Sequence, residues 1–190
     1  MSAINAPFGM RPSFHPSGLD RAVALPNGIA SGYSTGILKG QPVALTTSGN
    51  IIAATSGSAY QGAFAGHEYT DLTGRRLVSN QWIANTAYQT GSQVTYYYSD
   101  PNIVYDIQAD GSIAQTAIGD QANFSNISAG STNTGLSQCT ISSSLVGVGA
   151  LGDVRIIGLT PAVDNAFGDA FTVVQVQVSR SQYVATVNAI

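Results

Sequence analysis

Charged residues are scarce in this chain of 190 residues: they make up 9% of it, whereas roughly 25% is usual in globular proteins. Only one lysine, Lys39, is present. Lysines and net charge normally keep free monomers apart, above all along sheet edges. The deficit therefore predicts that neighbouring protein subunits cover much of the surface. The nine tyrosines agree with this prediction, because interface cores are rich in aromatic residues and poor in charge.

Basic clusters that could hold nucleic acid are missing as well. The net charge is −3, and of the seven basic residues only Arg75 and Arg76 are adjacent. Binding to phosphates requires clustered Lys and Arg side chains. We therefore expect no nucleic-acid partner.

Cysteine pairs and long apolar runs are also lacking. Cys139 is the single cysteine, so the chain cannot form an internal disulfide bond. No run approaches the roughly 18 apolar residues of a membrane helix, and prolines interrupt the first residues, where a secretory signal would need a continuous apolar stretch. We expect no membrane partner and no cross-linked core.

Helical periodicity is absent, since no stretch repeats apolar residues at i, i+3, i+4 and i+7 over three turns. Short apolar runs bounded by Gly, Pro, Ser or Asn recur instead, as in barrels and sandwiches. The sequence predicts an all-β fold, a compact antiparallel β-barrel or β-sandwich with little helix. The predicted strands are Tyr33 to Leu38, Val43 to Thr46, Ile51 to Ala54, Ala59 to Ala65, Arg76 to Trp82, Gln93 to Tyr98, Ile103 to Gln108, Asp153 to Leu159, Phe171 to Val178 and Tyr183 to Val187.

The chain length suits one domain. Residues 1–32 carry recurrent Pro and Gly with isolated aromatics, which predicts an extended N-terminal arm that lies on its own domain or on a neighbour. Residues 33–190 are expected to form a single β-rich domain. Within it, residues 119–150 are polar and rich in Gly and Ser and predict a long loop excursion.

Two glycine motifs match enzyme patterns only formally. Gly32–Gly36 reads GYSTG, but a nucleophile elbow needs an acid and then a histidine after the serine. No acid lies between Ser34 and His67, the only downstream histidine. Gly147–Gly152 reads GVGALG, but a β-branched run closed by Pro161 follows it, where a dinucleotide site needs a helix.

Metal and acid–base motifs are equally weak. The two histidines stand alone and one cysteine cannot build a zinc site. Asp106, Asp110 and Asp120 surround a predicted turn; a hairpin is the favoured interpretation and an incidental calcium ion the alternative. We expect no enzyme activity, no catalytic residue, no metal and no cofactor.

Aromatic and basic side chains are the candidate contact residues. The rings of Tyr96–Tyr98 alternate between the two faces of one strand, so at least one must face outward or towards a neighbour. Arg75 and Arg76 form either a solvated loop tip or pairs across a subunit contact. The full set of subunit or capsid contact candidates is Phe8, Arg11, Phe14, Arg21, Arg75, Arg76, Trp82, Tyr96, Tyr97 and Tyr98.

Several segments resemble known virion proteins. The run PVALTTSGNIIAATSGSAYQGAFAG is similar to a segment of the lambda-type head decoration proteins of tailed bacteriophages. The segments APFGMRPSFHPSGLDRA, EYTDLTGRR, SDPNIVYDIQADGSIAQTAIGDQANF and DNAFGDAF also look like a recurrent set of phage capsid cement or structural proteins. This second resemblance spans most of the chain. The chain departs from the smaller lambda-type family in its length and in the strands after residue 150.

The resemblance implies a structural virion protein that binds the outer surface of an icosahedral phage capsid and stabilises it by bridging capsomers. It further implies a homotrimer, the major capsid protein as partner, synthesis in the host bacterial cytoplasm, and an N-terminal arm that pairs with shell strands. Two alternatives stay open. One is another virion component, such as a tail, a fibre or a carbohydrate-binding adhesin module, and the other is a soluble enzyme.

Overall fold

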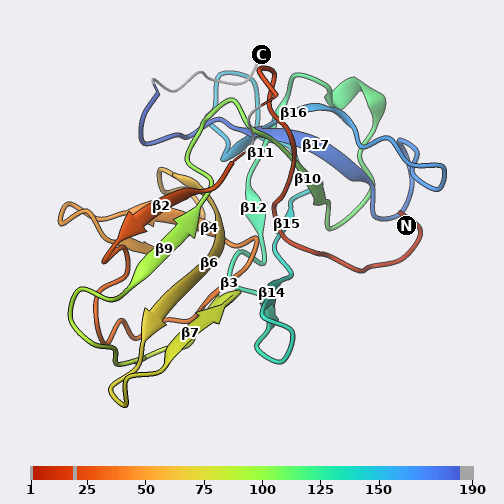
Figure 1. Cartoon of the computed structure of the whole chain (residues 1–190). Helices are drawn as coiled ribbons and strands as arrows, with labels where there is room; N and C mark the ends of the chain where they lie inside the picture. Colours follow the sequence, from red (N-terminus) through yellow and green to blue (C-terminus); the bar gives the residue numbers. More distant parts are fainter. Residues whose placement is uncertain (1, 19–20, 185–190) are drawn as a thin grey trace.

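The computed structural model describes residues 2–18 and 21–184, and its architecture is all-β with antiparallel sheets in a sandwich-like arrangement (Figure 1). The predicted fold class is confirmed. One sheet has five strands and a second has six, and the two lie in different halves of the molecule (Figure 1). Within the described residues, the helical structure is a single 3₁₀ turn, η1 (Gln115–Ala117).

The five-stranded sheet holds the most regular strands of the protein. Its order is β1 (Arg11–Phe14), β10 (Val104–Gln108), β17 (Val173–Val178), β16 (Val154–Leu159) and β11 (Gln121–Ala122). In β17, Val174 and Val176 are fully buried while Gln175 between them is half-buried, as the period of two requires. In β10 every residue is buried, because the N-terminal segment covers the face that looks away from the core.

The six-stranded sheet lies around the long strand β6. It contains β2 (Val23–Pro26), β9 (Val94–Tyr97), β6 (Gly62–Thr70), β4 (Pro42–Leu45) and β5 (Ile51–Ala53), with β7 (Arg76–Ser79) paired to the far end of β6. The strands β4 and β5 form a hairpin in which Thr46 N–H donates to Asn50 O at 2.9 Å. Gly49 in this turn has φ of 78°, a conformation that glycine adopts without strain.

Two clusters of buried side chains form the interior. The large core packs between the five-stranded sheet and one end of the six-stranded sheet, and the small core gathers Ile29, Ile37, Phe64, Trp82 and their neighbours. Two neighbouring residues of β6 belong to different clusters: Ala63 lies in the large core and Phe64 in the small core. The first part of β6 is therefore buried on both faces, and it joins the two halves.

Residues 1–32, predicted as an extended arm, contribute strands to both sheets. The strand β1 pairs with β10, and β2 pairs with β9. Met10 and Ile29 are buried in the large and the small core. This segment thus lies on its own domain, one of the two placements that the sequence left open.

The segment 119–150 is more ordered than a loop excursion. Besides β11 it forms two strand pairs, β12 (Phe124–Ser125) with β15 (Thr140–Ile141) and β13 (Gly130–Ser131) with β14 (Leu136–Ser137). Phe124 and Ile141 enter the large core. Each of these strands has two residues, too few for an alternation that sequence inspection could detect.

The remaining pair, β3 (Ile37–Leu38) with β8 (Gln81–Trp82), replaces two longer predicted strands. The predicted strand Tyr33 to Leu38 is regular only at its end. Of the predicted strand Tyr183 to Val187, residues 183 and 184 form a bend, and the rest lies outside the described residues.

A buried carboxylate connects the two sheets. Asp153 has no exposed surface and precedes β16. Its Oδ2 accepts hydrogen bonds from Phe124 N–H at 3.0 Å and Ser56 Oγ at 3.2 Å, and its Oδ1 accepts one from Gly57 N–H at 3.2 Å. Arg180 Nε lies 3.5 Å from Oδ1. A buried charge is tolerated where several donors and a cation surround it.

Asp153→Ala should lower the free energy of unfolding by about 3–5 kcal/mol, because it removes the acceptor of the buried Phe124 N–H and the anion beside Arg180. Urea denaturation followed by circular dichroism measures this. Asp120→Ala is the matched control, since the Asp120 carboxylate makes no hydrogen bond within the described residues. Equal stability of the two variants would contradict the assigned role of Asp153.

His67 lies inside an aromatic cluster in the six-stranded half. Its ring stacks on Tyr69 at 5.1 Å between centroids and meets the edge of Trp82 at 5.3 Å. The Nε2–H donates to Gln81 O at 2.8 Å. Burial lowers the pKa of His67 below its usual value, with the Gln81 hydrogen bond acting in the opposite direction. The neutral imidazole is therefore the form that the fold accommodates.

The fold should consequently lose stability as the pH falls. The unfolded chain protonates His67 near pH 6.5, while the native chain resists protonation, so stability is complete above about pH 6.5 and declines below it. The loss is at most about 1.4 kcal/mol per pH unit. Urea titrations at pH 7.5 and 5.5 measure it. His67→Phe should flatten this dependence and His15→Gln should keep it; the reverse pattern would refute the assignment.

Candidate interaction surface

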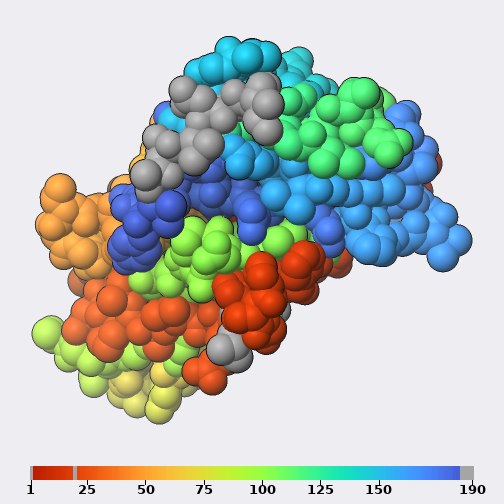
Figure 2. Space-filling model, turned by 90° about the horizontal axis from the view of Figure 1, so that it is seen from above, coloured from red at the N-terminus to blue at the C-terminus, as the bar shows by residue number. Residues whose placement is uncertain are grey.

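The N-terminal segment is fixed to the domain through Arg11. Arg11 stands opposite Asp106 in the β1–β10 pair, and its Nη2 lies 3.1 Å from Asp106 Oδ2. The guanidinium also lies 4.8 Å from the ring centroid of Phe8, a cation–π arrangement. Asp106 accepts a second hydrogen bond from Thr160 Oγ1 at 2.9 Å. In Figure 2 the red N-terminal residues form a ridge beside the green residues of the β9–β10 region.

Three candidate contact residues surround one hollow, which we name the Lys39 hollow. Its walls are residues 8, 10–12, 39–40, 64, 98 and 136, so that Phe8, Arg11 and Tyr98 meet there. The hollow has a volume of about 250 Å³. Lys39 and Leu136, at its rim, were not among the predicted contact residues. In the sequence, the only indication of this site is that the single lysine of the chain stands next to Gly40.

Arg76 and Tyr96 meet elsewhere, on the outer face of the six-stranded sheet. Arg76 Nη2 lies 2.8 Å from Glu68 Oε2, and Tyr96 Oη donates to Glu68 Oε1 at 3.1 Å. The Arg76 hydrogen bond, followed by that of Tyr96, holds the pKa of Glu68 below its usual value. Arg76 is thus paired within its own chain, while the side chain of Arg75 is exposed at the β6–β7 turn.

Trp82 and Tyr97 are core residues. They are 1% and 4% exposed and belong to the small core. Trp82 Nε1–H donates to Tyr33 O at 3.2 Å, which satisfies the polar atom of the indole. The structure places both rings away from the surface that a neighbour could contact. Tyr96 and Tyr98, on either side of Tyr97, are only half-buried, as the alternation along β9 predicts.

Phe14 and Arg21 remain at the surface. Phe14 is 44% exposed at the end of β1 and Arg21 is exposed before β2. Neither lies in the Lys39 hollow. The candidate residues therefore divide into a group at the hollow, a pair at Glu68, three exposed residues and two core residues.

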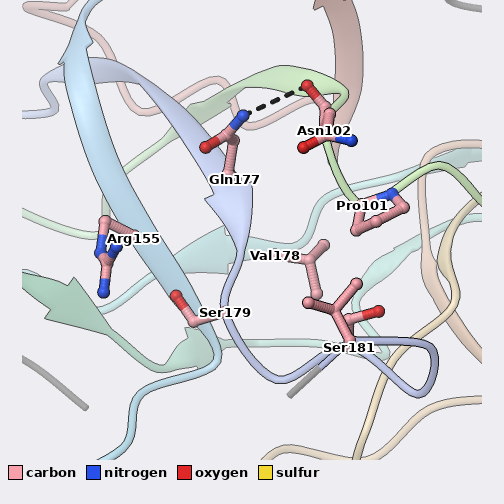
Figure 3. Close-up of a pocket in the computed structure, with 8 residues that line it drawn as sticks. Pro101, Asn102, Arg155, Gln177, Val178, Ser179 and Ser181 are labelled. Atoms are coloured by element: carbon pink, nitrogen blue, oxygen red, sulfur yellow. Dashed lines mark hydrogen bonds between the residues drawn. The ribbon is translucent and has the colours of Figure 1, made fainter. Parts of the chain in front are cut away.

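A second hollow of about 360 Å³ lies on the outer face of the five-stranded sheet (Figure 3). Arg155, Gln177 and Ser179 line it, and Gln177 Nε2–H donates to Asn102 O at 3.2 Å. It borders Val184, the last described residue. A third hollow, of about 440 Å³, lies beside Trp82 and the 62% exposed Ile83.

The three hollows have few ionisable side chains in their walls. Their lining residues include no His, Cys, Asp or Glu, the side chains that most often supply general acids and bases. Cys139 is buried, and desolvation raises the pKa of its thiol far above the usual value. Within the described residues, no group of three or more metal-ligating His, Cys, Asp or Glu side chains occurs.

Arg11→Ala should loosen the N-terminal segment. The mutation removes the ion pair with Asp106 and the contact with Phe8, and a half-exposed pair of this kind contributes up to about 1 kcal/mol. We expect amide hydrogen exchange in residues 8–14 to accelerate by a factor of up to about five. Arg75→Ala is the control and should leave these amides unchanged. Unaltered exchange in Arg11→Ala would show that β1 pairing alone holds the segment.

Comparisons with known proteins give no relative from which a function could be transferred. No protein-family model, no curated protein and no solved structure matches the chain. Among residues 2–18 and 21–184, no helix is long and apolar enough to cross a membrane. Function must therefore be inferred from the residues of this chain.

Proposed function

We propose that this protein is a structural virion subunit that binds the outer surface of an icosahedral phage capsid as a homotrimer and bridges neighbouring capsomers of the major capsid protein. The supporting observation is the position of the N-terminal strands. The strand β1 is the outermost strand of the five-stranded sheet, and β2 is the outermost strand of the six-stranded sheet. One segment thus provides an edge of each sheet.

Such edges suit the addition of a strand from a neighbour. Within the described residues, the outer sides of β1 and β2 have no strand partner. An edge strand presents backbone donors and acceptors that another chain can pair with. Free monomers protect such edges with lysine, with proline or with a bulge. The strand β1 has Pro12 and a bulge after it, whereas β2 has no lysine and its proline, Pro26, stands at its end. The outer side of β2 is therefore the edge better suited to strand addition.

The strand β2 also exposes apolar surface. Val23 is 45% exposed, and three of the four β2 residues are exposed. A shell strand added here would bury these side chains and gain main-chain hydrogen bonds without using charge. This matches a chain in which charged residues are 9% of the total.

Bridging then follows from multivalency. A stable interface buries roughly 1,200 Å² or more in total, and three linked copies must detach together before adjacent capsomers separate. The trimer therefore resists the outward pressure of packaged DNA even where each contact is weak.

The test is binding to expanded, empty shells of the source particle. The purified chain should co-sediment with the shells and raise their melting temperature, and absence of binding would disprove the proposal. Val23→Lys should weaken binding at least tenfold, because a lysine on the exposed edge opposes strand addition. Val148→Lys is the matched control, since Val148 is 87% exposed in a loop, and it should bind as the wild type does.

A further inference from the structure

The Lys39 hollow combines an apolar floor with a positively charged rim. Met10 and Phe64, which are 1% and 0% exposed, lie directly beneath its floor. Leu136, 44% exposed, forms part of its wall together with the half-buried Phe8. The apolar walls are therefore continuous with both cores of the protein.

The hollow is rigid because hydrogen bonds join four segments that are distant in the sequence. Met10 N–H donates to Gly40 O at 2.8 Å, and Gly40 N–H donates to Phe64 O at 2.8 Å. Ser137 N–H donates to Lys39 O at 2.9 Å. Gly40 has φ of 80°, and a Cβ there would lie 3.2 Å from Met10 O. A preformed site of this kind spares an occupant the entropic cost of ordering it.

The charge at the rim is unbalanced. Arg11 is paired with Asp106, whereas Lys39 is exposed and makes no ion pair within the described residues. No acidic residue lines the hollow. An apolar hollow beside an unpaired ammonium group favours a ligand that carries an apolar group next to a carboxylate.

We propose that the Lys39 hollow receives an apolar side chain that stands next to an Asp or Glu in an exposed segment of the shell protein. This inference rests on the proposed function and names the chemistry of the partner. The apolar side chain packs between Phe8 and Leu136, above the buried Met10 and Phe64, and the carboxylate pairs with Lys39. The volume of about 250 Å³ leaves room for one such side chain.

A small probe tests the ligand chemistry with the full chain. N-acetyl-leucinate and its uncharged counterpart N-acetyl-leucinamide are titrated into ¹⁵N-labelled protein. The leucinate should shift the amide signals of Lys39, Gly40 and Leu136, with an affinity several-fold above that of the amide. Lys39→Gln should remove this preference. Equal affinities for the two probes, or shifts that spare these residues, would overturn the inference.

The shell assay tests the partner. Lys39→Gln should weaken co-sedimentation at least tenfold, while Ser48→Glu, an exposed β4–β5 turn residue whose replacement lowers the net charge equally, should bind normally. If the wild type binds shells and Lys39→Gln binds equally well, the hollow is not the contact and the proposed function stands. If the wild type does not bind, the proposed function fails, and the shell protein is not the partner of the hollow. The probe titration then decides separately whether the hollow prefers carboxylates.

Discussion

The buried carboxylate of Asp153 bonds together segments from both halves of this fold. Asp153 satisfies donors from the β5–β6 turn and from β12, and it lies beside Arg180, which follows β17. Arg180 in turn accepts the backbone N–H of Tyr60 through its carbonyl at 2.7 Å, and the Tyr60 ring meets the edge of Phe124. The position of a large part of the core therefore depends on one charge that water does not reach.

The N-terminal segment determines which parts of the two sheets reach the surface. It covers the outer face of β10, where Gln108 Oε1 accepts from Ala6 N–H at 2.9 Å, and it supplies an outermost strand to each sheet. The Lys39 hollow exists only because this segment passes beside the β3–β4 turn. The same residues thus close the interior and create the surface on which the proposed contacts depend.

Regular strands could be predicted from the sequence because their side chains alternate. The valines and glutamines of β17 follow directly from that period, and the glycine at position 49 indicates the turn between β4 and β5. The interior roles of Phe124 and Ile141 could not be predicted, since two-residue strands pair across distant parts of the chain. Trp82 shows a further limit, because composition alone does not separate an aromatic residue of the core from one at an interface. The hollow beside Lys39 could not be predicted either, because its walls come from residues that are far apart in the sequence.

The closed environment of Cys139 has a consequence for crowded assemblies. Its sulfur is buried beside β15, and it is the only cysteine in the chain. Copies packed densely against one another in an oxidising medium would have no accessible thiol with which to become linked covalently. A disulfide bond between two copies of this protein therefore requires that a subunit first unfolds.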